Sequence, residues 1–321
     1  MKIGVFTVLF ANMGFEEMLD HVAQAGCEAV EIGVGGYPGD AHCKAAELLK
    51  DEGARKKFAK AVEKRGLVIS ALSCHGNAVH PNADVAREHH EAWRNAVLLA
   101  EALGVERVVT FSGCPGDSEG AKAPNWVTCP WPPDFSETVK WQWEEKLIPY
   151  WREEAKYARQ HGVKMICFEM HPGFCVYNPE TLLKLREACG EEIGANFDPS
   201  HLFWQGIDPV AAIRELGSAI YHVHAKDVKI DAINTARNGV LDTKPYTNEA
   251  ARSWIFRTVG WGHDAAVWKD MVSALRLVGY DFVLSIEHED SLMSIGEGFR
   301  RAVAFLKEVT ISEPPPKVWW A

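Results

Sequence analysis

The chain has 321 residues, of which 47% are hydrophobic and 24% are charged, so it is long and apolar enough to bury a large core. Its formal net charge is −10 at pH 7 and it holds no long run of Lys or Arg, which argues against nucleic acid as a partner. Its 8 cysteines show no C-x-x-C spacing and no segment has the length of a membrane span, so we expect a cytoplasmic protein with reduced thiols and no membrane contact.

Residues 3–11 form a short apolar run behind Met1 and Lys2, an arrangement that also begins secretory signal peptides. Thr7 interrupts this run, and an amphipathic helical pattern from Phe15 follows it directly. We therefore interpret residues 2–9 as a first β-strand of the mature fold.

A repeating unit then runs along the chain: a helical pattern, a glycine and a short run rich in β-forming residues. Each glycine stands where a helix ends in a left-handed residue. The glycines are Gly26, Gly66, Gly104, Gly162, Gly190, Gly217 and Gly279. The runs that follow them are residues 29–34, 68–72, 107–111, 164–169, 193–198, 220–224 and 282–287.

With residues 2–9, this makes eight strands that alternate with helices, which predicts a parallel sheet closed into a (β/α)₈ TIM barrel. An open, doubly wound sheet is the competing architecture, but Gly33-Val34-Gly35-Gly36 is not the G-x-G-x-x-G turn that it requires. We expect one domain over residues 1–321.

Two units are overlong, with insertions over about residues 113–145 and 228–263, both at the C-terminal mouth of the barrel. The first contains four tryptophans, which either pack on the barrel rim or form a pocket wall that suits the C–H face of a sugar. They are Trp126, Trp131, Trp141 and Trp143. A Pro/Trp-rich tail, residues 312–321, contains Trp319 and Trp320, which we expect to dock on the barrel or on a neighbouring subunit of a homo-oligomer.

The alternation of side chains along the later predicted strands indicates a functional site, because successive side chains point to the barrel interior and to the helices in turn. In residues 164–169, Ile166 and Phe168 share an apolar face, while Cys167 and Glu169 share the inward face. The next three runs repeat this pattern, and each inward face ends in an ionisable group. The four groups are Glu169, Asp198, His224 and Glu287.

Crowded inward charges of this kind need a compensating cation. Three carboxylates and one imidazole, without a thiolate, favour Mn²⁺ or Mg²⁺, with Co²⁺ or Fe²⁺ as alternatives, over a structural zinc. We expect one divalent metal at this site and no nucleotide cofactor.

The site resembles that of the xylose isomerase-like TIM barrels, which include sugar phosphate isomerases/epimerases, ketose 3-epimerases and inosose dehydratases. The resemblance rests on Phe168-Glu169, on Asp198-Pro199-Ser200-His201, on the six residues from His222 to Asp227, and on Ile286-Glu287. It implies that Glu169, Asp198, His224 and Glu287 hold the metal. It also implies that His201 either contacts the substrate or supports a metal ligand, and that His75 contacts the substrate; the alternative for His75 is a packed, hydrogen-bonded histidine.

Three further residues allow two interpretations each. Lys226 either pairs with Asp227 as a structural lock, which we favour, or reaches a substrate oxygen. Arg257 either clamps a substrate group or is an exposed loop arginine. His222 lies one layer below His224 and is either a fifth metal ligand or, as we expect, a satisfied interior histidine.

The chemistry that this arrangement implies is proton transfer beside a carbonyl. A metal on adjacent carbonyl and hydroxyl oxygens stabilises an enediolate, and Glu169 and Glu287 act on opposite faces of the carbon. We therefore expect a metal-dependent sugar isomerase/epimerase that acts on a small-molecule sugar or keto-sugar, as the ketose 3-epimerases do.

The residues after His224 favour an alternative, because ketose 3-epimerases continue with Glu and Arg where this chain reads Ala225-Lys226-Asp227. That pattern is more similar to inosose dehydratases. The alternative is a metal-dependent lyase that expels water, or an aglycone from a 3-keto-glycoside, by β-elimination. A phosphodiesterase of the endonuclease IV type is disfavoured by the acidic charge, and a barrel that only binds sugar is disfavoured by the complete ligand set.

Overall fold

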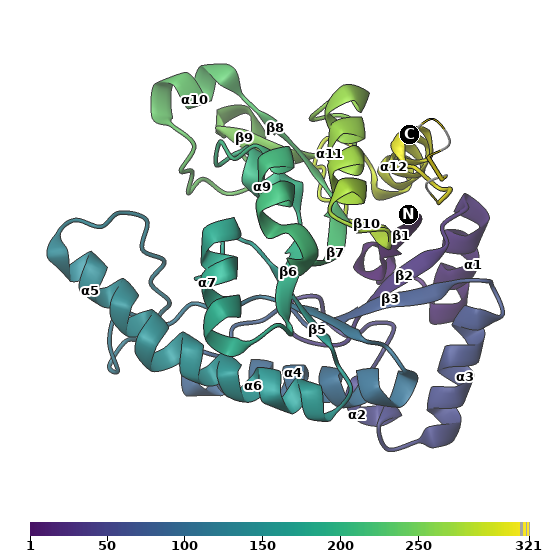
Figure 1. The fold of residues 1–321 in the computed structure, drawn as a ribbon, viewed down its shortest axis with the longest axis horizontal. Helices are drawn as coiled ribbons and strands as arrows, with labels where there is room; N and C mark the ends of the chain where they lie inside the picture. The colour runs from purple at the N-terminus through teal and green to yellow at the C-terminus, as the bar shows by residue number, and fades with distance from the viewer. Residues whose placement is uncertain (315–316, 319, 321) are drawn as a thin grey trace.

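The computed structural model describes residues 1–314, 317–318 and 320 (Figure 1). Its central element is a closed barrel of parallel strands in the order β1-β10-β7-β6-β5-β4-β3-β2, which confirms the predicted TIM barrel. The barrel strands are β1 (Lys2–Phe6), β2 (Ala29–Gly33), β3 (Val68–Ser73), β4 (Arg107–Thr110), β5 (Met165–Glu169), β6 (Ile193–Phe197), β7 (Ile220–Ala225) and β10 (Val283–Ile286). The first apolar run thus pairs with β10 and β2 inside the barrel.

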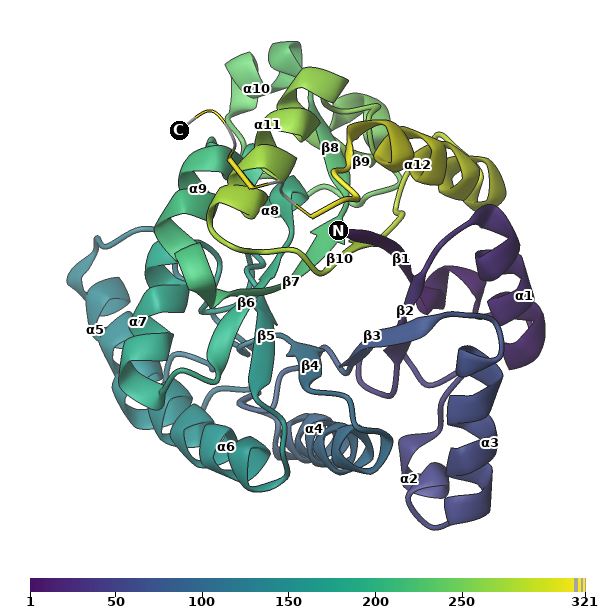
Figure 2. The same ribbon diagram turned by 45° about the vertical axis from the view of Figure 1, so that its right-hand side comes forward.

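Helices surround the strands on all sides (Figure 2). They are α1 (Phe15–Ala25), α2 (Ala45–Leu48), α3 (Glu52–Glu63), α4 (Ala83–Leu103), α6 (Ile148–Gln160), α7 (Pro179–Cys189), α8 (Pro199–Phe203), α9 (Pro209–Leu216), α11 (Ala265–Leu277) and α12 (Ile295–Val309). Gly26 and Gly104 end α1 and α4 in the left-handed conformation, with φ of 85° and 69°, as the repeating unit predicts.

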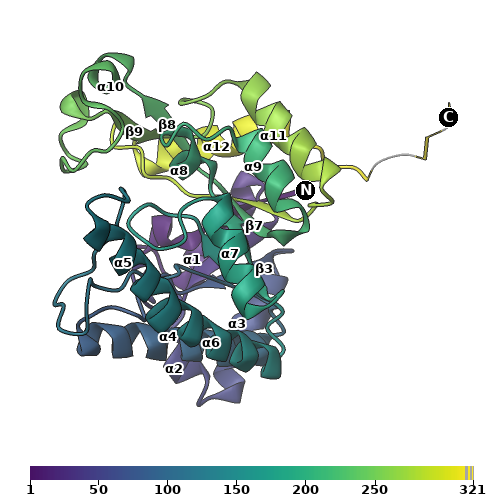
Figure 3. The ribbon, with the colours of Figure 1, turned by 60° about the vertical axis from the view of Figure 1, so that its left-hand side comes forward.

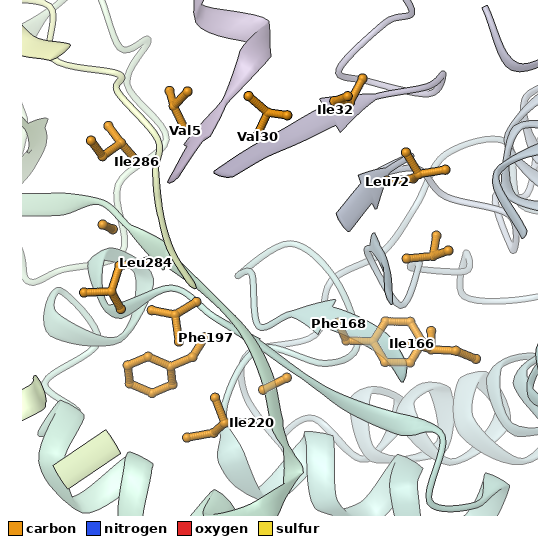
Figure 4. Packing of buried hydrophobic residues seen from close by; sticks show 14 of the residues in the cluster. Val5, Val30, Ile32, Leu72, Ile166, Phe168, Phe197, Ile220, Leu284 and Ile286 are labelled. Carbon is orange, nitrogen blue, oxygen red and sulfur yellow. The ribbon is translucent and has the colours of Figure 1, made fainter. Parts of the chain in front are cut away.

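The strands have two buried faces, as expected for a barrel. Ile166 and Phe168 of β5 belong to the large core between the strands and the helices (Figure 4). There Phe168 lies edge-on to Trp151 of α6, at 4.5 Å between ring centroids. Cys167, between them in sequence, packs with Ala71 and Val109 in a separate cluster. The predicted phase of β5 is therefore confirmed.

Two long segments lie at the mouth of the barrel and extend to the same side of the molecule (Figure 3). The segment between β4 and α6 contains α5 (Pro133–Trp141) and a π-helix (Gln142–Leu147). The segment between β7 and α11 contains an antiparallel pair, β8 (Asp227–Ile230) and β9 (Trp254–Arg257), joined through α10 (Ala232–Asn238). The sequence analysis did not predict this pair.

In the described part of the chain, no helix is both long and apolar enough to cross a membrane. Trp319 of the tail lies outside the described residues, so docking of the two terminal tryptophans stays a prediction, as do the homo-oligomer and the cytoplasmic location.

Candidate metal centre

Four strand ends bring the predicted ligands together. Glu169 is the last residue of β5, Asp198 follows β6, His224 lies in β7 and Glu287 follows β10. One potential ligand atom from each lies within 4.8 Å of the others. Asp198 and His224 are fully buried, and the Glu287 side chain is 14% exposed.

Several atoms of this cluster have no hydrogen-bond partner among the described residues: Asp198 Oδ2, His224 Nδ1 and Glu287 Oε2. His224 Nδ1 lies 2.8 Å from Glu287 Oε2 and 3.3 Å from Glu169 Oε2. A buried polar atom without a hydrogen bond costs free energy, and the carboxylates of Glu169 and Glu287 also repel that of Asp198. A divalent cation satisfies all of them at once, and the oxygen-rich donor set fits a hard cation.

The other nitrogen of His224 is held by a residue that the sequence analysis missed. Nε2 lies 3.0 Å from both carboxylate oxygens of Glu31, in β2. The hydroxyls of Ser73 and Ser285 donate hydrogen bonds to the same carboxylate at 2.5 and 2.7 Å. The contact with Glu31 orients the His224 imidazole so that its Nδ1 points toward the cluster. Carboxylates that hydrogen-bond to metal-binding histidines act in the same way.

Glu31 is completely buried, which by itself raises the pKa of its carboxyl. The His224 and His222 imidazoles and the hydrogen bond from Ser285 outweigh this effect and lower the pKa to about 2. Glu31 is therefore an anion inside the barrel. The signal for it in the sequence is one acidic residue within the otherwise apolar run 29–34.

Both histidines predicted at the substrate, His75 and His201, touch Glu169. His75 Nε2 lies 3.0 Å from Glu169 Oε2, and His201 Nε2 lies 3.1 Å from Glu169 Oε1. Burial alone raises the pKa of Glu169, but hydrogen bonds from His201, His224 and His75 outweigh burial and hold it well below its usual range. His75 also lines the cavity at the mouth of the barrel.

Lys226 does not pair with Asp227, so the predicted lock between them is wrong. Lys226 Nζ lies 3.2 Å from Glu287 Oε1 and 2.6 Å from Glu289 Oε2, at the cavity. Asp227 instead contacts His263 Nδ1 at 2.8 Å and accepts backbone N–H groups of residues 260, 262 and 263. Successive residues in extended backbone point in opposite directions, which prevents the two side chains from meeting.

Arg257 lies in β9, where its Nε donates to Asp290 Oδ2 at 3.0 Å. It is not among the described residues that line the main cavity, and its substrate contact stays a prediction. His222 is the satisfied interior histidine that was expected, since its ring nitrogens lie 2.9 Å from Asn196 Oδ1 and 3.2 Å from Ser70 Oγ.

The cavity above the cluster has a volume of about 640 Å³. Its walls are largely aromatic, and six of the lining residues are Phe6, Tyr37, Phe111, Phe174, Tyr246 and Phe256. None of the four tryptophans of residues 113–145 is among them, so their interpretation as a wall of this pocket is wrong; Trp143, for example, is buried in the core. His171, which the sequence analysis also missed, lines the cavity with its ring centroid 4.1 Å from that of His201.

Comparison with known proteins places this geometry in a family. The family model described as "Xylose isomerase-like TIM barrel" matches residues 19–309. The chain is 41% identical over 315 residues to the uncharacterized protein YfiH of Bacillus subtilis (strain 168). The alignment covers 98% of this chain and 100% of that protein.

It is also 26% identical over 244 residues to an inosose dehydratase of Mesomycoplasma hyopneumoniae (strain 7448), covering 73% of this chain and 72% of that enzyme. A crystal structure of the IolI protein with a bound zinc atom superposes with a TM-score of 0.65 at 17% identity, over 96% of this chain and 98% of that chain. This protein belongs to the xylose isomerase-like TIM barrel family.

Proposed function

We propose that this protein is a divalent-metal-dependent carbon–oxygen lyase that removes a proton beside the carbonyl of a cyclic keto-sugar or keto-polyol and expels a β-substituent. The observation that carries the proposal is a cluster of four candidate ligands, three of them with unpaired buried atoms, next to a cavity that Glu169, Glu287 and the buried Lys226 line. The inosose dehydratase relative supports the same class of reaction.

Glu169, Asp198, His224 and Glu287 are the residues that hold the metal in this proposal. When bound there, a divalent cation polarises the carbonyl and stabilises the charge that develops as the neighbouring carbon loses its proton. Mn²⁺ fits the oxygen-rich donors best, with Mg²⁺ and Co²⁺ next. The zinc in IolI adds Zn²⁺ to the ions worth testing.

Glu169 is the proposed base. Its carboxylate lines the cavity and is oriented by His75 and His201 at 3.0 and 3.1 Å, so little reorganisation is needed before it accepts a proton. The electron pair of the broken C–H bond forms a C=C bond as the β C–O bond breaks. Lys226, a buried ammonium at the cavity, gives its proton to the departing oxygen, which leaves as water or an alcohol.

Epimerisation is the second candidate, and one observation favours it: Glu169 and Glu287 come from β5 and β10, which are separated in the barrel by β6 and β7, so they approach a substrate from different directions. It requires Glu287 as a free second base. Because Lys226 Nζ lies 3.2 Å from Glu287 Oε1, this carboxylate is already neutralised by a cation. The ion pair makes elimination the preferred outcome.

Incubation of the Mn²⁺-loaded protein with inososes, ketohexoses and 3-keto-glycosides in D₂O tests both candidates. Incorporation of deuterium at the carbon next to the carbonyl demonstrates proton abstraction. An unsaturated product together with water or a released alcohol supports the lyase, and an inverted, deuterated substrate supports the epimerase. The absence of both deuterium incorporation and an elimination product in every member of the panel would contradict the proposal.

A further inference from the structure

A second, smaller cavity, which we call the tryptophan cavity, is lined by Trp126, Tyr177 and Trp204, with Thr128 and Gln205 as its polar side chains. Its volume is about 190 Å³. The described residues that line it include no charged side chain, so it suits a neutral ligand. A cavity of about 150 Å³ takes up benzene, and this one is therefore large enough for a single six-membered ring.

Both tryptophans of the cavity have a buried indole N–H group without a hydrogen-bond partner among the described residues. Elsewhere in the protein, buried indoles are paired: Trp151 donates to a backbone carbonyl oxygen at 2.7 Å and Trp254 to another at 2.9 Å. Since an unpaired buried donor costs free energy, an acceptor supplied from outside the chain would stabilise the N–H groups of Trp126 and Trp204. Trp204 is only 5% exposed, so bulk water does not reach most of it.

The aromatic rings give the cavity flat apolar walls in fixed orientations. Trp126 lies edge-on to Tyr177, with ring centroids 5.6 Å apart and an interplanar angle of 80°. Trp204 stacks on Trp254 at 4.7 Å and 8°, which holds its ring in place. A hydroxyl-bearing ring, a pyranose or a cyclitol, combines C–H faces for such walls with oxygen acceptors for the two N–H groups.

Segments that form the main site also form the tryptophan cavity. In the loop after β5, Phe174 lines the main cavity and Tyr177 lines the tryptophan cavity. Helix α8 begins directly after Asp198 and ends just before Trp204, and six residues of helix span about 9 Å. In the segment between β7 and α11, Phe256 lines the main cavity and Val240 the tryptophan cavity.

We propose that the two cavities bind one two-ring substrate, with a keto ring at the metal centre and a second, uncharged, hydroxyl-bearing ring between Trp126 and Trp204. This inference rests on the proposed function for the position of the keto ring. The second ring supplies acceptors to both indole N–H groups and lies against their neighbouring aromatic faces.

Titration calorimetry of the Mn²⁺-loaded protein tests the second ring without turnover. The one-ring probes are D-glucose and myo-inositol, and the two-ring probes are cellobiose, maltose and trehalose. We expect at least one two-ring probe to bind about tenfold more tightly than either one-ring probe, which corresponds to about 1.4 kcal/mol. If no two-ring probe gains more than about twofold, the proposal is wrong.

Trp126→Phe and Trp204→Phe remove one indole N–H each and keep an aromatic ring. In each variant we expect the two-ring to one-ring affinity ratio to fall toward one, with unchanged metal content as the check on folding. The matched control is Trp131→Phe, in the same segment, because Trp131 is 73% exposed and lines neither cavity; the ratio should stay at its original value. A ratio that survives in both cavity variants places the second ring elsewhere and overturns the proposal.

The result for the second-ring site can be distinguished from the result for the proposed lyase activity. Deuterium exchange with a one-ring keto substrate, without any two-ring advantage, would reject the second-ring site and leave the lyase intact. A two-ring advantage that depends on Trp126 and Trp204, with neither deuterium exchange nor an elimination product in any substrate, would support the binding site and reject the lyase.

Discussion

The polar side chains on two sides of the barrel differ in their hydrogen bonding. On the ligand side, formed by β5, β6, β7 and β10, the atoms Asp198 Oδ2, His224 Nδ1 and Glu287 Oε2 lack hydrogen-bond partners among the described residues. On the support side, formed by β1 to β4, Glu31 and His75 each hydrogen-bond to a residue of the ligand side. One side is arranged to receive a positive charge, and the other fixes the groups that receive it.

The largest effect should follow removal of a ligand atom from the ligand side. In the parent protein, Asp198 Oδ1 accepts a hydrogen bond of 2.8 Å from the Ser200 N–H. Asp198→Asn keeps this acceptor, so the start of α8 is preserved while a carboxylate ligand is lost. We expect this variant and His224→Ala to lose activity. Their metal affinity should fall by more than the roughly 10–100-fold that is typical when a residue that only hydrogen-bonds to a ligand is replaced. Metal analysis of the purified proteins provides the measurement.

The control for this experiment is Asp208→Asn, since Asp208 caps α9 in the same way but lies outside the cluster. It should bind metal as the parent does. Unchanged metal content in both Asp198→Asn and His224→Ala would show that the metal lies elsewhere.

The next effect separates the two glutamates of the ligand side. Glu169→Gln and Glu287→Gln keep an oxygen ligand but remove a basic carboxylate, so part of the metal should be retained. We expect turnover to fall on the order of 10²-fold or more in each. In the lyase account, Glu169→Gln abolishes deuterium incorporation from D₂O, whereas Glu287→Gln still permits it.

Equal loss of deuterium incorporation in both glutamine variants would favour the epimerase, which uses a base on each face. Full activity in Glu169→Gln would exclude Glu169 as the base.

A smaller effect is expected from the support side. Glu31→Gln removes the anion behind His224 Nε2 while keeping the shape of the side chain. Metal affinity should fall by about 10–100-fold, because the imidazole is less well oriented and less basic. Competition with a chelator measures this change.

Glu154→Gln is the matched control, because Glu154 is also a buried glutamate but bonds to Trp93 and Arg94, away from the cluster. It should leave the metal affinity unchanged. Parent-like affinity in Glu31→Gln would contradict the division of the barrel into two sides.

The smallest effect concerns the hydroxyls that hold Glu31. Ser285→Ala removes one hydrogen bond of 2.7 Å to its carboxylate. At about 1 kcal/mol for such a bond, metal affinity should fall by roughly fivefold, less than in Glu31→Gln. Ser273→Ala, which removes an exposed hydroxyl bonded only to a carbonyl of its own helix, should have no effect on the same chelator competition. A loss as large as that of Glu31→Gln would mean that Ser285 does more than support Glu31.

The ligand side was predictable from the sequence because strand periodicity is local. Once residues 164–169 are assigned as a strand, the alternation places Cys167 and Glu169 inward, and the structure agrees. The same argument places Asp198, His224 and Glu287 at the mouth, since parallel strands end together at one end of a barrel.

The support side and the mouth segments were harder to predict from the sequence, because their contacts join residues that are distant in sequence. Glu31 meets His224 across 193 residues, and a lone acidic residue in an apolar run gives no indication of its partner. The β8–β9 pair joins strands separated by α10 and a long connection, which obscures the short-range signal of a hairpin. The Lys226–Asp227 prediction failed for a local reason, since neighbours in an extended chain point apart.

The central claim is that one divalent cation is bound by Glu169, Asp198, His224 and Glu287. Its most direct test is an anomalous difference map from crystals of the Mn²⁺-loaded protein, collected near the manganese edge. The account predicts one strong peak at roughly 2.0–2.3 Å from an atom of each of these four side chains. A peak coordinated by Glu31 and His222, or the absence of a peak at the mouth of the barrel, would contradict it.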